Sequence, residues 1–359
     1  MAQYISFQPS DYFKTLIWTG TDAARTLTGV GFQPDCTWIK NRDAAYNHVL
    51  WDAVRTGGSN KAISPNTNGA EGAPNSAAYG YLNAFTSDGY SLGEGSSNDS
   101  YVNTTGTDYV SWNWKAGTTT GIDATGATIT PNSYSFNQTS GFSIIEYEGN
   151  ATGGALLPHG LGVVPEFAIF KSVDDSPNWR VYHKNMDSTA PEDYALILND
   201  TSVRDNDNTA FNDTAPTSVN MCLGSSPTTN DGSTMIAYFF AGKSGYSKFG
   251  SFIGNGNADG TFVYTGFRPA FLLIKNIETS GTYWIGYDDK RPGYNVDNGF
   301  LEMNYAGTEG TTKDIILASN GFKPVLSIND TNQSGKTFIY AAFSKFPLVS
   351  SNDVPGVAR

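Results

Sequence analysis

Short apolar or alternating runs, separated by polar turns rich in glycine, extend along most of the chain. The stretch TYWIGYD at 282–288 alternates with a period of two, which predicts a half-buried strand. The stretch FLLI at 271–274 is continuously apolar, which predicts a strand buried on both faces. No segment shows the repeat of an amphipathic helix over about twelve residues. The pattern therefore predicts an all-β protein of antiparallel strands with very little helix.

One phrase of this pattern occurs three times along the chain. It reads GFQPDCTWIK at 31–40, LGVVPEFAIFK at 161–171 and GFRPAFLLIK at 266–275. An aromatic strand follows each copy, namely HVLWDAVR at 48–55, WRVYHKNM at 179–186 and WIGYDDKR at 284–291. The 131 residues from Lys40 to Lys171 equal the spacing from Trp51 to Tyr182. Two landmarks that shift together indicate an internal duplication.

Each copy closes with a third apolar strand, at 109–117, 235–245 and 338–347. We therefore expect three tandem antiparallel β-sandwich repeats of the jelly-roll or lectin-like kind. Their expected bounds are 1–117, 139–245 and 246–347, with a linker at 118–138 and a C-terminal tail at 348–359. The stretch between Gly57 and Gly80 is polar and turn-rich, so we expect a surface loop there.

The repeated phrase also makes local predictions. We expect its proline to be the first residue of the core strand, where a missing N–H costs least. The repeated phrase ends in a lysine each time, at Lys40, Lys171 and Lys275. We expect this lysine to mark the exit of the strand to solvent.

Charge and cysteine content narrow the classes of function. The 359-residue chain carries a net charge of −12 and no cluster of lysines and arginines, which argues against nucleic-acid binding. We expect its cysteines, Cys36 and Cys222, to be free and packed as small apolar groups. The first residues, MAQYISFQPSDYF, lack the basic and apolar regions of a signal peptide. No run approaches the roughly 18 apolar residues of a membrane span. We expect a protein made in a cytoplasm, without membrane insertion.

Candidate catalytic groups are few. The histidines His48, His159 and His183 do not hold matching positions in the copies, and no HExxH, GxSxG or Walker-type sequence is present. A glycoside hydrolase needs only two carboxylates, and the candidate pairs are Glu146 with Glu148 and Asp288 with Asp289. The other copies do not repeat the glutamate pair. We expect that the protein is not an enzyme.

Loops rich in aspartate raise the question of calcium. They lie at 172–178, 198–208 and 327–335, and each could supply several oxygen ligands. None follows the order of an EF-hand, and the turn-forming tendency of aspartate and asparagine explains them equally well. We expect no cofactor, with calcium as the open alternative.

Two recurring features could contact a ligand. Asp52 with Arg55, and Asp288 with Arg291, follow the aromatic strand in the first and third copies. A salt bridge that pins the corner is the simpler explanation, and a ligand contact is the alternative. Tryptophans can stack on the apolar faces of sugars or pack in a core. The candidate binding residues are therefore Trp51, Asp52, Arg55, Trp179, Trp284, Asp288 and Arg291.

The phrases GVGFQPDCTWIKNRDAA, YVSWNWKAG, GYSKFGSFIGNGNADG and YTGFRPAFLLIKN are similar to phrases in virion proteins of marine tailed bacteriophages. Those proteins are described as tail-fibre or structural proteins with concanavalin A-like, lectin-type β-sandwich domains. The resemblance covers nearly the whole chain. It implies a virion location, other virion proteins as partners, host surface carbohydrate as a ligand and assembly as a homo-oligomer, with a trimer favoured.

Three hypotheses follow. The first is a tail-fibre or receptor-binding component whose loops contact host surface glycans. The second is a capsid-decorating or tail-assembly component without a receptor role. The third is an enzyme that acts on polysaccharide. Exposed aromatic side chains on one face would favour the first, a large flat apolar surface the second, and two carboxylates in a cleft the third.

Overall fold

The structure, a computed structural model, describes residues 7–291, 295 and 299–347. This part consists mainly of antiparallel strands, with the one-turn helices α1 (Ser76–Tyr79) and α2 (Asn208–Phe211) and the 3-10 turns η1 (Pro9–Asp11) and η2 (Pro191–Asp193). The prediction of an all-β fold with very little helix is confirmed. The expected tail at 348–359 lies outside the described residues. No helix in the described part is long and apolar enough to cross a membrane.

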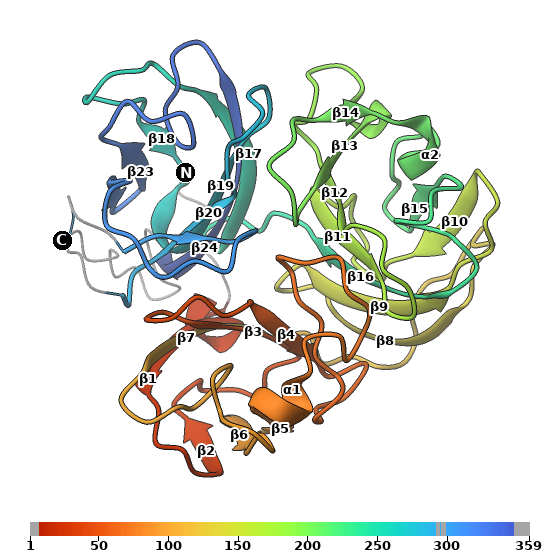
Figure 1. The fold of residues 1–359 in the computed structure, drawn as a ribbon. Coiled ribbons are helices and arrows are strands. Elements are labelled where there is room, and N and C mark those ends of the chain that lie inside the picture. Colours follow the sequence, from red (N-terminus) through yellow and green to blue (C-terminus); the bar gives the residue numbers. More distant parts are fainter. Residues whose placement is uncertain (1–6, 292–294, 296–298, 348–359) are drawn as a thin grey trace.

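The chain forms three lobes around a common centre (Figure 1). We call β1 to β7 the first lobe, β8 to β16 the second and β17 to β24 the third. In each lobe a larger sheet packs on a smaller one, and a separate hydrophobic cluster fills the space between them. Each lobe is thus a two-layer β-sandwich.

The strands of each sheet follow in spatial order. The first lobe has β1 (Phe13–Thr19), β7 (Asp108–Trp114), β3 (Cys36–Asn41) and β4 (Val49–Asp52), opposed by β2 (Arg25–Thr28), β6 (Gly89–Gly93) and β5 (Tyr81–Thr86). The second has β14 (Asp205–Asn206), β13 (Tyr194–Ile197), β12 (Arg180–His183), β11 (Phe167–Ser172), β16 (Thr234–Phe240), β9 (Phe142–Glu148) and β8 (Pro131–Asn137), opposed by β10 (Ala155–Pro158) and β15 (Asn220–Leu223). The third has β17 (Ser247–Ile253), β24 (Thr337–Pro347), β19 (Phe267–Asn276), β20 (Ile285–Asp288) and β21 (Leu301–Glu302), opposed by β18 (Val263–Tyr264), β23 (Gly321–Pro324) and β22 (Ile315–Ala318).

The three larger sheets share one strand order. It runs β1-β7-β3-β4 in the first lobe, β9-β16-β11-β12 in the second and β17-β24-β19-β20 in the third. The register agrees as well, because Lys40 pairs with Val110, Lys171 with Ile236 and Lys275 with Ile339. Positions in different lobes can therefore be compared directly. That the lobes arose by duplication, and the domain bounds given above, stay predictions.

A fourth hydrophobic cluster lies where the lobes meet. It joins aromatic side chains from all three larger sheets, among them Trp114, Phe167, Phe240, Phe271 and Phe343. Each core strand thus has one face on its own smaller sheet and the other on the common centre. This arrangement explains why FLLI is apolar at every position, and the prediction of burial on both faces is confirmed. The same centre encloses an apolar cavity of about 40 Å³.

Two local predictions about the repeated phrase are wrong. The proline does not start the strand: Pro34 and Pro165 precede β3 and β11, and Pro269 lies inside β19 at a break in register. A bulge tolerates proline because no ladder hydrogen bond is needed there. The lysines do not exit to solvent either, since Lys40, Lys171 and Lys275 are all 0 % exposed.

Each buried lysine ties down the loop that follows its strand. Lys40 Nζ donates to the carbonyl oxygen of Ala44 at 3.3 Å, Lys171 Nζ to that of Asp175 at 2.9 Å and Lys275 Nζ to that of Thr282 at 2.6 Å. Burial lowers the pKa of Lys40 to about 7 and those of Lys171 and Lys275 to about 8. The lysine satisfies carbonyls that would otherwise be buried without a donor.

Two segments expected to be loop and linker have structural roles. In the linker at 118–138, residues 131–137 form β8, and Ile129 and Phe136 are buried. In the loop at 57–80, Ala62 is buried in the core of the first lobe, Ile63 is buried in the common centre, and Ser64 is buried where it contacts the second lobe. Their polar composition concealed these roles, because only a few apolar side chains in each segment face inward.

Candidate functional site

The recurring Asp–Arg pair is a buried salt bridge in both lobes that carry it. Arg55 Nη2 lies 2.7 Å from Asp52 Oδ2, and Arg291 Nε lies 2.7 Å from Asp288 Oδ2. In each pair the backbone N–H of the arginine also donates to Oδ1 of the aspartate. The salt-bridge interpretation is confirmed. All four side chains are buried, so the arrangement offers none of them to a ligand from solvent.

The aspartate of each pair also accepts a hydrogen bond from a neighbouring lobe. Asp52 Oδ2 accepts a hydrogen bond from the hydroxyl of Tyr238 in the second lobe at 2.6 Å. Asp288 Oδ2 accepts one from Trp112 Nε1 in the first lobe at 3.0 Å. His183 holds the same position in the second lobe, and its Nε2 lies 3.2 Å from the carbonyl oxygen of Tyr340 in the third. The three contacts form a closed ring, first lobe to second to third to first.

A second ring of contacts runs in the opposite direction. Trp179 Nε1 donates to the carbonyl of Ser64 in the first lobe at 3.0 Å, and Trp284 Nε1 donates to that of Ile197 in the second at 3.0 Å. His48 holds the matching position in the first lobe, with Nε2 lying 3.2 Å from the carbonyl of Glu302 in the third. Trp51 bonds within its own lobe, to Gly58. Trp51, Trp179 and Trp284 are all buried, so none of these indole side chains is available to stack on a sugar.

A third ring is made by backbone groups alone. The N–H of Glu71 donates to the carbonyl of Val173 at 2.8 Å, that of Arg204 to Ile277 at 3.1 Å and that of Glu309 to Arg42 at 2.8 Å. Each donor lies in the segment of chain that runs from the last strand of the shared order (β4, β12 or β20) to the next strand of the smaller sheet. Each acceptor lies two residues after the buried lysine. The lobes are therefore joined by equivalent hydrogen bonds at all three boundaries.

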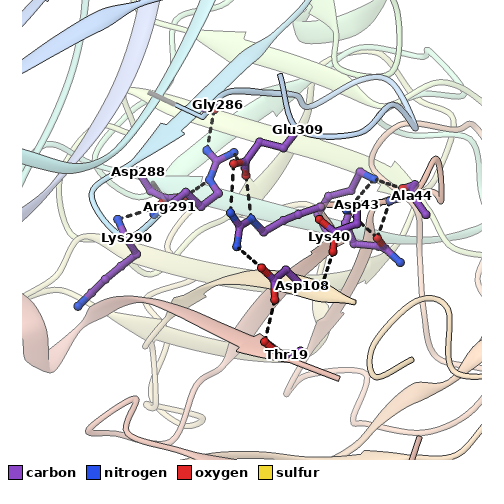
Figure 2. A network of polar contacts seen from close by, with 12 residues as sticks. Thr19, Lys40, Asp43, Ala44, Asp108, Gly286, Asp288, Lys290, Arg291 and Glu309 are labelled. Carbon is purple, nitrogen blue, oxygen red and sulfur yellow. Dashed lines mark hydrogen bonds and ion pairs between the residues drawn. The ribbon is translucent and has the colours of Figure 1, made fainter. Parts of the chain in front are cut away.

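Charged side chains reinforce the boundary between the third and first lobes (Figure 2). Glu309 Oε2 lies 2.8 Å from Arg42 Nε and 3.3 Å from Arg291 Nη1. Arg42 Nη1 in turn lies 3.6 Å from Asp108 Oδ2. Glu309 thus connects Arg42 of the first lobe with Arg291 of the third, and the Asp288–Arg291 pair belongs to this wider network. These partly buried contacts hold the boundary in place.

The histidines are placed as neutral hydrogen-bonding groups. Burial lowers the pKa of His183 to about 3 and that of His159 to about 4, and it holds the pKa of His48 well below its usual range. Each ring nitrogen Nε2 faces a backbone carbonyl. A general base at neutral pH needs access to a substrate, and all three histidines are buried.

The described residues hold no group of three or more histidine, cysteine, aspartate or glutamate side chains placed to bind a metal ion. Calcium binding by the aspartate-rich loops therefore stays an untested alternative. Both cysteines, Cys36 and Cys222, are free and buried, as expected. Burial raises the pKa of each thiol.

An open polar cleft lies between the first lobe and strand β8. Its volume is about 610 Å³, and its lining residues are Gln33, Asp35, Ala53, Val54, Lys115, Gly117, Thr119, Asn132, Ser133, Tyr134 and Ser135. Asp35 lies at its buried side, where Oδ2 accepts from the N–H of Ala116 at 2.8 Å and Oδ1 from the hydroxyl of Ser135 at 3.0 Å. Burial raises the pKa of this carboxyl.

The cleft suits a neutral polar ligand better than an apolar one. Its size is in the range of small-molecule sites, and its walls supply amide, hydroxyl and ammonium groups beside one partly buried tyrosine. The sequence did not indicate this site, because one wall comes from the segment expected to be a linker. The only available signal was the alternating stretch PNSYSFN at 131–137.

Comparison with known proteins gives one result. No curated protein and no solved structure matches this chain. A family model described as a domain of unknown function, DUF7483, matches residues 8–347, which include all three lobes. The chain belongs to this family.

Proposed function

We propose that this protein is a non-catalytic component of a tailed-bacteriophage particle, and that it contacts host surface glycans as part of a tail fibre or receptor-binding assembly. The observation that carries the glycan part of the proposal is the cleft between the first lobe and β8. Asn132, Ser133 and Lys115 offer amide, hydroxyl and ammonium groups along its walls. Sugar recognition relies on several hydrogen-bonding groups that converge in a concave site.

The three-lobed architecture supports a structural role on a particle. A shared hydrophobic centre and three rings of inter-lobe hydrogen bonds hold the lobes together, with loops at their surface. Rigid scaffolds with variable loops are suited to presenting binding sites. Together with the resemblance of its repeated phrases to phage virion proteins, this supports a virion location.

A second candidate is a capsid-decorating or tail-assembly component without a receptor role. The burial of all seven tryptophans favours it, because the ring most suited to stacking on sugars is never at the surface. The two candidates differ in where the protein lies on the particle and in whether the cleft binds a glycan.

Two experiments test the proposal. Purified particles are imaged with a gold-labelled antibody against this chain, and label on tail fibres or the tail tip is expected. The isolated protein is then screened on an array of bacterial surface glycans, with Asn132→Ala/Lys115→Ala as the cleft variant and Tyr305→Ala, an exposed tyrosine of the third lobe, as the control. Binding that only the cleft variant loses supports the glycan site. Label spread over the head, with no glycan bound, would establish the decorating role instead.

A further inference from the structure

The cavity of about 40 Å³ in the common centre is built by all three lobes. Its wall includes Trp38, Ile169 and Leu273, which are the residues two positions before each buried lysine. Every side chain that lines the cavity is buried. The cavity therefore lies inside the molecule, between the three larger sheets.

One small residue of the third lobe explains the open space. Each of the three residues named above pairs with a residue on the neighbouring strand of its sheet, and these partners are, in chain order, Trp112, Tyr238 and Ala341. The third lobe thus supplies a methyl group where the other two lobes supply an aromatic ring. Ala341 and Tyr238 both line the cavity, so the volume that a third ring would fill is left open beside them.

The exchange to alanine is matched by a second exchange across the boundary. Trp112 and Tyr238 each donate a hydrogen bond to an aspartate of a neighbouring lobe, whereas Ala341 has no side-chain donor. The residue at the position of those aspartates is here His183, and its Nε2 lies 3.2 Å from the backbone carbonyl of Tyr340 instead. Because both partners differ together, no carboxylate is left buried without its donor. The small residue at the centre is therefore part of a consistent boundary and not an isolated packing defect.

The wall of the cavity is unsuited to water. Three lining side chains carry an N–H or O–H group that bonds to a residue outside the wall, namely Trp38 to His48, Trp179 to Ser64 and Tyr238 to Asp52. The indole N–H of Trp114 has no hydrogen-bond partner among the described residues. A buried water needs two to four polar partners, so this one donor is too few to hold it. An apolar occupant loses no hydrogen bonds on entering such a space.

We propose that the cavity at the centre of the three lobes binds one small apolar ligand. One water needs about 10–15 Å³, so the cavity has room for a molecule of about two or three heavy atoms, or for one xenon atom. The ligand is held by dispersion contacts with the surrounding carbon atoms, which the open space otherwise forfeits. Because the whole wall is buried, entry depends on fluctuations of the packed centre, which restricts the ligand to small molecules. The inference does not depend on the particle proposal.

The test uses xenon, dissolved at increasing pressure, with the whole protein labelled with carbon-13 in its methyl groups. The methyl resonances of Ile169, Leu198 and Leu273, which line the cavity, should shift saturably in the NMR spectrum. The methyl resonances of Leu157, in the separate core of the second lobe, should not. Absence of a saturable shift in the wild type would overturn the proposal.

Variants of the third lobe locate the site. Ala341→Val adds two methyl groups to the wall and should abolish the xenon-induced shifts. Ala342→Val makes the same change at the next residue, which packs in the third lobe's own core, and should keep them. Leu273→Ala enlarges the cavity and should admit benzene, which the wild type excludes, so it tests the site even if Ala341→Val does not fold. Equal losses of xenon binding in Ala341→Val and Ala342→Val, or exclusion of benzene by Leu273→Ala, would contradict the proposed site.

Discussion

Trp112 of the first lobe donates its indole N–H to the carboxylate of Asp288 in the third lobe, 176 residues away in the chain. Tyr238 of the second lobe makes the matching bond to Asp52 of the first. Equivalent polar groups thus cross two boundaries between lobes, and His183 crosses the remaining one. Four of the candidate ligand contacts, Asp52, Trp179, Trp284 and Asp288, instead make hydrogen bonds that join the lobes, whereas Trp51 bonds within its own lobe.

Removing one donor from these hydrogen bonds between the lobes should destabilise the protein. Tyr238→Phe keeps the ring packing and leaves a buried oxygen of Asp52 without one donor, so the free energy of unfolding should fall by about 1–3 kcal/mol. The measurement is chemical denaturation followed by fluorescence. Tyr305→Phe, at a side chain 53 % exposed, is the control and should change little. Equal stability of Tyr238→Phe and wild type would show that the bond contributes nothing.

Replacing only one residue of the Asp288–Arg291 pair should strongly lower the free energy of unfolding. Asp288→Asn leaves Arg291 buried with half of its neutralising charge removed, and a loss of about 3–5 kcal/mol is expected. The double change Asp288→Asn/Arg291→Met should lose less than Asp288→Asn alone, because no unpaired charge remains. A double variant that is less stable than either single variant would contradict this account of the pair.

The buried lysines predict a rise in stability with pH. Their folded pKa values, about 7 for Lys40 and about 8 for Lys171 and Lys275, lie below the ordinary value of 10.5. Above its folded pKa each lysine is neutral in the native state and still protonated in the unfolded state. The unfolded state therefore binds more protons, and the free energy of unfolding should increase between pH 7 and about 8.5.

Variants of the lysines test the source of that rise. Lys171→Met should reduce the slope of unfolding free energy against pH above pH 8, while Lys61→Met, at a partly buried surface position, should leave it unchanged. Denaturant titrations at several pH values provide the slopes. A slope that Lys171→Met does not alter would mean that this lysine keeps the same protonation in both states.

The two thiols should be unreactive in the folded protein. Cys36 and Cys222 are buried, and burial raises the pKa of both, so little thiolate is available at neutral pH. A thiol reagent that gives a coloured product should therefore react slowly under native conditions and with both thiols in denaturant. Rapid native reaction of Cys36 would indicate that the centre between the lobes opens readily.

The sequence predicted the fold better than the site. The apolar runs led directly to the buried core strands. The period-two stretch TYWIGYD also marked a strand, but the expected half-burial is wrong, because β20 is buried on both faces between its own lobe and the common centre. The repeated aromatic strand, at 48–55, 179–186 and 284–291, also placed Asp52, His183 and Asp288 at one position. Their contacts across the lobes were not foreseeable, since the partners Tyr238, Tyr340 and Trp112 lie far away in the chain.

Two errors have a common physical cause. Lys40 was expected at the surface because a charged group seldom lies in a core, yet its ammonium is satisfied there by loop carbonyls. Segment 118–138 was expected to be a linker because its apolar residues are sparse, yet the pairing of β8 with β9 and the burial of Ile129 and Phe136 anchor it. In both cases tertiary hydrogen bonds or one buried ring outweighed the local composition.

The central claim is that the three lobes form one cooperative unit, held by the shared apolar centre and the rings of inter-lobe hydrogen bonds. Differential scanning calorimetry of the whole chain tests it most directly. We expect a single reversible transition whose calorimetric and van't Hoff enthalpies agree. Two or three separable transitions would contradict the claim, because they would show that the lobes unfold independently.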